Sequence, residues 1–343
     1  MIRKLSIAVL LWGSSLPLAA ACSHPEESVT PTVAERELTA QAIDADPLAM
    51  LPGGFIALLR VEIQPALGSA LGPALMSISQ QLAPLPASAG FRIDQNLERV
   101  VIGLYSMQGV DLAGVATGTF DEKAIANAAS QPTTGPAGGA LVKSPYGGRT
   151  LYTVNNVGFC ILTGKTALFG NETGMRRALD RLREGRATRH LPEWTAELLD
   201  SSRAPVGFGA DLRIDAVSES LRRQAPFLSA LDAVRVLGNY QPPGFNLAGS
   251  LDYATPEAAS AGAASMLAAK QSLSQGATLM QLFGVPQPID RLEARADARQ
   301  VQFVAALDGP GVAKLLTLAL PLLGGSTVSG GVLPAQLSPG TGG

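Results

Sequence analysis

The sequence contains few of the residues that enzymes most often use as nucleophiles, bases and metal ligands. In 343 residues there are two cysteines and two histidines. His24 and His190 are far apart, and the acidic residues do not follow the spacing of a calcium-binding loop. We therefore expect no metal site and no cofactor.

Aromatic residues make up 5% of the chain, and the formal net charge is −2. Sugar-binding clefts are commonly lined by aromatic rings, so this composition disfavours a glycosidase with paired carboxylates. A chain of nearly zero net charge has no general attraction to nucleic acid or to anionic lipid. We therefore expect no nucleic-acid partner.

Two common catalytic motifs are also missing. Beyond residue 22 there is no Gly-x-Ser-x-Gly pentapeptide of the kind that carries the nucleophile of α/β-hydrolases. The segment from Gly158 to Gly164-Lys165-Thr166 has five residues between its glycines, where a phosphate-binding loop has four, and these residues favour a strand. We expect a hairpin turn there.

His190 lies in the basic linker 186–190, where a solvated histidine is the ordinary interpretation. We therefore expect no catalytic residue and no enzyme activity. A hydrolase with a non-standard site, which would have to use His190, remains an alternative.

The amino-terminal end has the organisation of a secretory signal. Arg3 and Lys4 precede an apolar run over 5–12, and three alanines, 19–21, come just before Cys22. A charged start, a short apolar run and a small-residue cleavage site are typical of a signal peptide. The apolar run is too short to span a bilayer, which takes about 20 residues.

The segment Leu18-Ala19-Ala20-Ala21-Cys22 resembles the lipobox of bacterial lipoproteins, although Ala19 stands where leucine is usual. The resemblance implies that residues 1–21 are removed and that Cys22 receives acyl chains such as palmitate, which anchor the protein to a membrane. Ser23 follows, where aspartate would favour the inner membrane. The resemblance therefore favours the outer membrane of the cell envelope.

Residues 22–46 are polar and weakly periodic, which predicts a flexible tether. Glycine, serine and proline dominate 324–343, which predicts a disordered tail. With Cys22 acylated, Cys160 cannot form an internal disulfide, and its apolar surroundings at 157–162 indicate a buried small side chain.

The body of the chain alternates strand and helix patterns. We expect an α+β fold in which antiparallel sheet carries helices on one face, because strand pairs are joined by tight turns. The predicted strands are 55–63, 99–105, 111–120, 140–143, 149–154, 157–162, 167–170, 205–214, 233–238, a strand opening at 246, and a pair within 291–307. The predicted helices are 67–82, one opened by Asp121, 172–184, 194–199, 216–231, one opened at 255–257, and 311–323.

The order of these elements recurs along the chain. The pattern strand, helix, strand, strand, helix describes both 47–200 and 201–323. We therefore predict two α+β pseudo-repeats, although sequence identity between them is low and a chance recurrence is the alternative.

The body weakly resembles uncharacterised bacterial envelope proteins of the DUF3352 type. The resemblance rests on the strand and helix pattern over 48–323 and on the turn Tyr146-Gly147-Gly148-Arg149-Thr150-Leu151-Tyr152. It implies an envelope location and carries no activity.

Several arginines gather on the predicted helix 172–184. They form a possible surface for an anionic partner, Arg176, Arg177, Arg181 and Arg183. Pairing with Asp180 and other acidic neighbours is the simpler interpretation.

We expect a non-catalytic, membrane-anchored envelope lipoprotein with a binding or structural role, whose partner is a protein. The main alternative is a carrier of an apolar ligand or lipid, with a cavity lined by residues such as Leu58, Ile102, Phe159 and Phe303. An ordinary core would use the same side chains.

Overall fold

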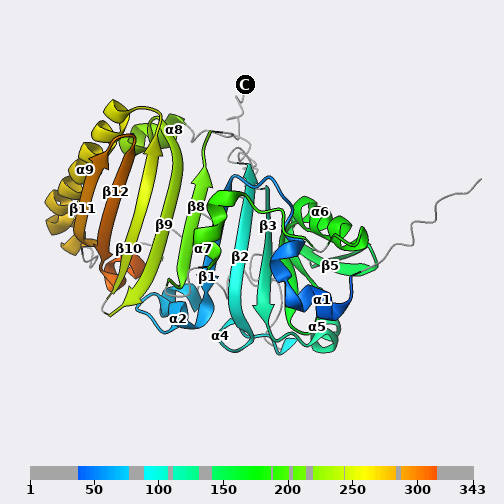
Figure 1. Ribbon diagram of the computed structural model, residues 1–343. Coiled ribbons are helices and arrows are strands. Elements are labelled where there is room, and N and C mark those ends of the chain that lie inside the picture. Colours follow the sequence, from blue (N-terminus) through cyan, green and yellow to red (C-terminus); the bar gives the residue numbers. More distant parts are fainter. Residues whose placement is uncertain are drawn as a thin grey trace, which may run out of the picture. The chain divides into compact units, whose positions relative to one another are not determined.

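The computed structural model describes residues 38–76, 89–106, 111–130, 141–186, 188–200, 204–213, 219–242, 244–282 and 287–314 (Figure 1). The predicted signal 1–21, Cys22, most of the predicted tether and the predicted tail 324–343 lie outside these residues. Within the described part, no helix is long and apolar enough to cross a membrane.

The described strands form one antiparallel sheet, as the alternating patterns predict. In sheet order the strands are β11 (Ile289–Asp297), β12 (Gln300–Leu307), β10 (Gly244–Tyr253), β9 (Leu231–Gln241), β8 (Val206–Asp211), β1 (Ala57–Glu62), β2 (Leu97–Ser106), β3 (Asp111–Gly118), β7 (Thr166–Asn171), β6 (Val157–Ile161), β5 (Arg149–Val154) and β4 (Val142–Tyr146). The predicted α+β class with antiparallel sheet is confirmed.

Helices and 3₁₀ turns connect these strands. They are α1 (Ala40–Ala45), η1 (Pro47–Met50), α2 (Ile63–Leu67), α4 (Ile93–Asn96), α5 (Glu122–Ala128), α6 (Glu172–Arg183), η3 (Glu193–Thr195), α7 (Ala196–Asp200), α8 (Glu219–Gln224), η4 (Pro226–Leu228) and α9 (Pro256–Leu282). A further helical stretch begins after Asp308, whose carboxylate accepts from the Gly311 amide at 2.7 Å.

The helices pack on both faces of the sheet, and the prediction that they lie on one face is wrong. Successive strand residues point to opposite faces. Val115 belongs to a core with Met175 and Leu179 of α6, whereas its neighbour Ala116 belongs to a core with Ile125 of α5. The face bearing Val115 also carries α7, and we name it the α7 face.

The opposite face carries α9 and is named the α9 face. Its core joins Leu251 of β10 and Val301 of β12 to Ala259 and Ala263 of the helix. Cross-strand pairing places these strand residues on the same face as Ala116. Each half of the sheet therefore has its own apolar core on this face.

The two runs of strands meet where β1 pairs with β8. Arg60 of β1 stands opposite Gly207 of β8, is 2% exposed, and lies beneath α7. Its guanidinium donates to the Ala204 carbonyl and, at 3.2 Å, to the Glu62 carboxylate. Burial lowers the pKa of Arg60, and Glu62 opposes that shift.

Glycines on β8 allow helix α7 to lie directly on the sheet. A Cβ at Gly209 would meet Leu198 Cδ1 at 2.5 Å and Trp194 Cζ3 at 2.7 Å. A Cβ at Gly207 would meet the Leu198 carbonyl oxygen at 3.0 Å. The missing side chains therefore set how closely α7 approaches the sheet.

Several local predictions are confirmed. Asp121 caps α5 through a 3.0 Å hydrogen bond from the Ala124 amide. Gly147, Gly148, Asn155 and Asn156 all have positive φ, at the tight turns expected between β4, β5 and β6. The stripe predicted for the helix 172–184 is buried and consists of Met175, Ala178, Leu179 and Leu182.

The predicted tether extends too far toward the body. Residues 40–45 form α1, Ile43 is fully buried, and Asp44 accepts hydrogen bonds from Thr163 at 2.5 Å and Thr166 at 2.8 Å. Folded structure therefore includes the last part of the segment predicted as a tether.

Two helix predictions also need correction. The predicted helix 216–231 ends as α8 at Gln224, and Leu231 already begins β9, because Pro226 opens a separate 3₁₀ turn. The predicted helix 67–82 overlaps α2 only at Leu67, residues 68–71 form a turn, a helical stretch follows at 72–76, and 77–82 lie outside the described residues. Most of the predicted helix 311–323 lies outside them too.

The sheet order bears on the predicted repeats. From the β1–β8 pair outward, one half runs β1, β2, β3, β7, β6 and the other runs β8, β9, β10, β12, β11. The first half then adds β5 and β4, which have no described counterpart in the second half. The two pseudo-repeats stay a prediction.

We predict that Gly209→Ala lowers the free energy of unfolding by about 1–3 kcal/mol, because the new methyl group overpacks the contact with Leu198 and Trp194. Gly164→Ala is the matched control, since a Cβ there meets no atom closer than 3.9 Å. Urea unfolding measures both. Equal stability of the two variants would show that α7 does not pack tightly on β8.

Candidate functional site

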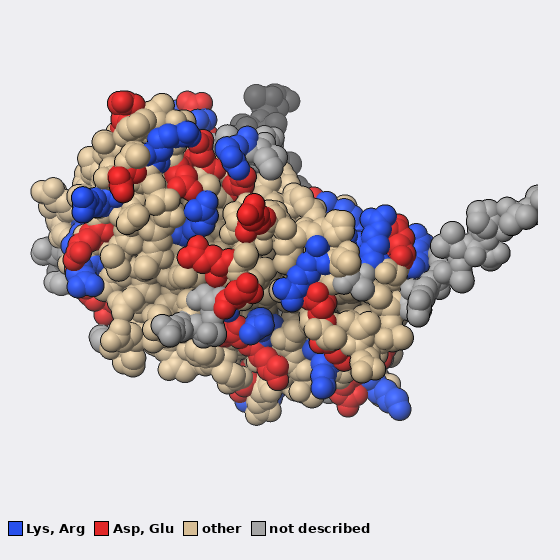
Figure 2. All heavy atoms as spheres, in the orientation of Figure 1, with Lys and Arg blue, Asp and Glu red and all other residues tan. Residues whose placement is uncertain are grey.

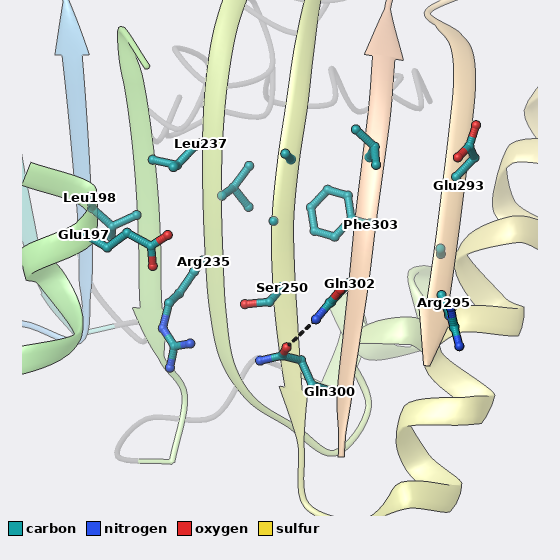
Figure 3. Close-up of a pocket in the computed structure, with 15 residues that line it drawn as sticks. Glu197, Leu198, Arg235, Leu237, Ser250, Glu293, Arg295, Gln300, Gln302 and Phe303 are labelled. Atoms are coloured by element: carbon teal, nitrogen blue, oxygen red, sulfur yellow. Dashed lines mark hydrogen bonds between the residues drawn. The ribbon is translucent and has the colours of Figure 1, made fainter. Parts of the chain in front are cut away.

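A groove of about 540 Å³ opens on the α7 face of the second half of the sheet (Figure 3). Its floor is formed by β9, β10 and β12, and β11 lies at one side. At the other side Glu197 and Leu198 project from α7. The described lining contains one hydroxyl group, on Ser250, and no histidine, cysteine or lysine.

The register of the strands arranges the floor in two rows. Arg235, Ser250, Gln302 and Arg295 stand side by side on β9, β10, β12 and β11 and form a polar row. Two residues along each strand, an apolar row contains Leu237, Ala248 and Val304 and ends at Glu293. Adjacent members of a row are about 4.8 Å apart, so each row spans four strands.

The size of the side chains explains why the surface is hollow. On β10 the groove is lined only by Ala248, Gly249 and Ser250, while the flanking strands carry longer residues such as Leu237 and Gln302. A strand of short side chains between strands of long ones leaves a trough. Val304, on the flanking strand β12 beside this trough, is 41% exposed.

A chain of polar contacts closes one end of the groove. The guanidinium of Arg235 lies 3.1 Å from the Asp252 carboxylate, which also accepts from Gln300 Nε2 at 2.8 Å. Gln302 Nε2 in turn donates to Gln300 Oε1 at 3.3 Å, drawn as a dashed line in Figure 3. These contacts orient Arg235 and Gln302 of the polar row before any ligand binds.

The walls of the groove carry both signs of charge. Glu197 stands on α7, and Glu293 and Arg295 stand on β11 (Figure 3). The wider face is mixed as well, with acidic and basic side chains interspersed over the surface seen in Figure 2. Such a surface suits a ligand with both charges and apolar groups, for which a polypeptide segment is the natural candidate.

The predicted arginine surface on α6 does not form a free cationic patch. Arg176 pairs with Glu172 at 2.5 Å, Arg177 with Asp111 at 2.6 Å and Arg183 with Asp180 at 3.4 Å. Arg176 and Arg177 also lie over the rings of Tyr146 and Tyr105. The simpler interpretation, local pairing, describes these three residues.

Arg181 differs from the other three because it is buried. It is 6% exposed, and its guanidinium donates to the Ala49 carbonyl at 3.1 Å and the Thr188 carbonyl at 2.7 Å. Burial lowers its pKa. Its role is to join α6 to η1, and it cannot reach an external anion.

The structure does not assemble a site for either alternative function, the hydrolase that would use His190 or the carrier of an apolar ligand. His190 is exposed, and no group of three potential metal ligands occurs among the described residues. Leu58 lies in the core under α6, Phe159 packs against the α5 core, and Phe303 packs against the α9 core. Ile102 is half-buried on the α9 face. No one cavity is lined by all four.

Of the residues that line the groove, only Phe303 was named from the sequence, as part of an apolar cavity that Leu58, Ile102 and Phe159 do not share. The alternation of Arg291 to Asp297 and of 300–307 was a visible signal, and it predicted strands correctly. It could not show which face of the sheet is open or that Arg235 and Ser250 are cross-strand neighbours, because those contacts depend on strand order.

No protein-family model and no curated protein matches this sequence. Among solved structures, the chain is similar to crystal form III of TP0453, with a TM-score of 0.51 and 11% identity over 80% of this chain and 98% of that chain. Crystal form I of TP0453 gives a TM-score of 0.48 and 12% identity, over 80% of this chain and 97% of that chain. The similarity to crystal form III shows a shared fold, and it assigns no activity to this chain.

Cys160 is buried in the core under α6, as predicted, and burial raises the pKa of its thiol to about 12. We predict that in a Cys22→Ala chain near pH 8 this thiol reacts with Ellman's reagent at least about a hundredfold more slowly than after urea unfolding, because little thiolate forms. Rapid reaction of the native chain would show that Cys160 is accessible. A Cys22→Ala, Cys160→Ala chain provides the blank.

Proposed function

We propose that this protein is a non-catalytic binding protein of the bacterial envelope, anchored to a membrane through acyl chains on Cys22. Its binding site is the groove on β9, β10 and β12, and its ligand is a segment of a protein partner. The observation that carries the proposal is the pairing of a polar row with an apolar row on one open surface.

The geometry of the groove favours recognition over chemistry. Ser250 stands between Arg235 and Gln302. The described lining contains no histidine or lysine that could activate its hydroxyl group as a general base. The side chains on either side of it are already engaged, Arg235 in an ion pair with Asp252 and Gln302 in a hydrogen bond to Gln300. Such groups present a fixed pattern of hydrogen-bond donors and acceptors, which makes the groove specific for a complementary ligand.

The walls favour a protein segment over an acyl chain. An apolar ligand gains most from an enclosed apolar pocket, whereas this groove is open and has Glu197, Glu293 and Arg295 beside it. Leu237 and Val304 can receive an apolar side chain of the partner. Arg235, Ser250 and Gln302 can receive its amide groups or a charge.

The proposed anchor rests on the segment 18–22 and its position after a short apolar run. Ser23 after the acylated cysteine favours the outer membrane. Several acyl chains hold a protein stably on a bilayer, since each buried methylene contributes about 0.8 kcal/mol.

We predict that cells fed a clickable palmitate analogue label the wild-type protein and the Cys160→Ala variant, but not the Cys22→Ala variant. The Cys22→Ala variant should also leave the membrane fraction. In-gel fluorescence and fractionation measure these outcomes. A labelled Cys22→Ala protein, or an unlabelled wild type, would refute the proposed anchor.

We predict that a photo-crosslinking amino acid at Val304 captures a discrete partner in living cells. Val157 is the matched control, because it is also an exposed valine on a strand, at 49% exposure, and lies in the other half of the sheet. Adding Arg235→Ala should weaken capture from Val304. Equal capture from both positions, or none from Val304, would contradict a binding role for the groove.

A further inference from the structure

The strand β11 is an outer strand of the sheet, and within the described part of the chain nothing pairs with its outer side. On the α7 face it carries Arg291, Glu293, Arg295 and Asp297, whose charges alternate in sign along the strand. All four residues are exposed. On the α9 face, between Arg291 and Asp297, the same strand carries only the apolar residues Leu292, Ala294 and Ala296.

This order of charges is complementary to itself when the strand is reversed. If Ala294 stands opposite Ala294 of an antiparallel second copy, Glu293 faces Arg295 and Arg291 faces Asp297. By two-fold symmetry that register gives four pairs of opposite charge. On the other face, Leu292 meets Ala296, so apolar groups also meet apolar groups.

The same charges disfavour the neighbouring registers. Side chains of the two copies stay on matching faces of the sheet only when one strand shifts by two residues, or a multiple of two, relative to the other. One such shift places Glu293 opposite itself and Arg291 opposite Arg295. The shift in the other direction places Arg295 opposite itself and Glu293 opposite Asp297. Both bring like charges together, which disfavours them.

Helix α9, which packs beside β11, has an exposed apolar residue, Leu267, on its flank toward the outer edge of β11. Gly262 of α9 contacts Tyr253 of β10, toward the middle of the sheet. Leu267 follows five residues later, so it projects about 140° around the helix from Gly262. It therefore lies on the flank that faces away from β10, toward the β11 edge, and it is 42% exposed.

We propose that two copies of this chain associate by antiparallel pairing of their β11 strands, in the register that places Ala294 opposite Ala294. The two sheets then continue into one another, and Leu267 of each α9 lies beside the seam. Charged edge strands generally resist pairing with foreign strands. Here the order of the charges admits a second copy of the same strand.

The proposal can be tested by reversing charges singly and together. The intact chain carrying Cys22→Ala is used, so that shared acyl chains cannot hold copies together, and sedimentation velocity gives the mass and the dissociation constant. Glu293→Arg and Arg295→Glu are compared with the double variant and with Lys123→Glu. Lys123 is an exposed residue on α5 in the other half of the sheet and controls for the change of net charge.

We expect the Cys22→Ala chain and the Lys123→Glu variant to form dimers. Each single reversal on β11 converts two attractive pairs into two repulsive pairs and should raise the dissociation constant about tenfold. The double variant exchanges the two charges, restores the opposite-charge pairs and should restore the dimer. A monomeric Cys22→Ala chain, or a double variant no better than the single variants, would overturn the proposal.

Discussion

The pairing of β1 with β8 is the contact on which the arrangement depends. It joins two runs of strands, far apart in sequence, into one sheet. Because β8 presents Gly207 and Gly209 to the α7 face, α7 can lie over this junction and above the buried Arg60. Leu198, the residue of α7 that contacts both glycine positions, also lines the groove. The close approach of one short helix thus determines both the seal over the junction and one wall of the site.

Local sequence signals predicted the elements whose cause is local. The Asn155-Asn156 turn needs only two residues that tolerate positive φ, and the Asp121 cap needs only a nearby amide. The stripe of α6 follows from helical spacing. Predictions failed where contacts between residues far apart in the sequence determine which face of the sheet a helix covers or whether a side chain is buried. The prediction of helices on one face could not account for the adjacent residues Val115 and Ala116 serving two different cores, and the burial of Arg181 depends on carbonyl groups supplied by Ala49 and Thr188.

The groove shows the same limit for function. Its lining comes from α7 and four strands, and each segment alone reads as an ordinary amphipathic strand or helix. The short side chains of Ala248 and Ser250 become a hollow only when Leu237 and Val304 stand beside them. Sequence reasoning can find motifs whose residues are contiguous, such as the segment ending at Cys22. It cannot find a surface whose chemistry is created by strand order.

Asp44 has a mechanical consequence. Its carboxylate joins α1 to Thr163 and Thr166, at the turn between β6 and β7. Tension applied to the chain from its amino-terminal side therefore enters the sheet at that turn. Five strands lie between β6 and β9, the first strand of the groove floor, so the load is spread over many backbone hydrogen bonds before it reaches the groove. A protein held in this way can be pulled at one end without changing the shape of the surface it presents at the other.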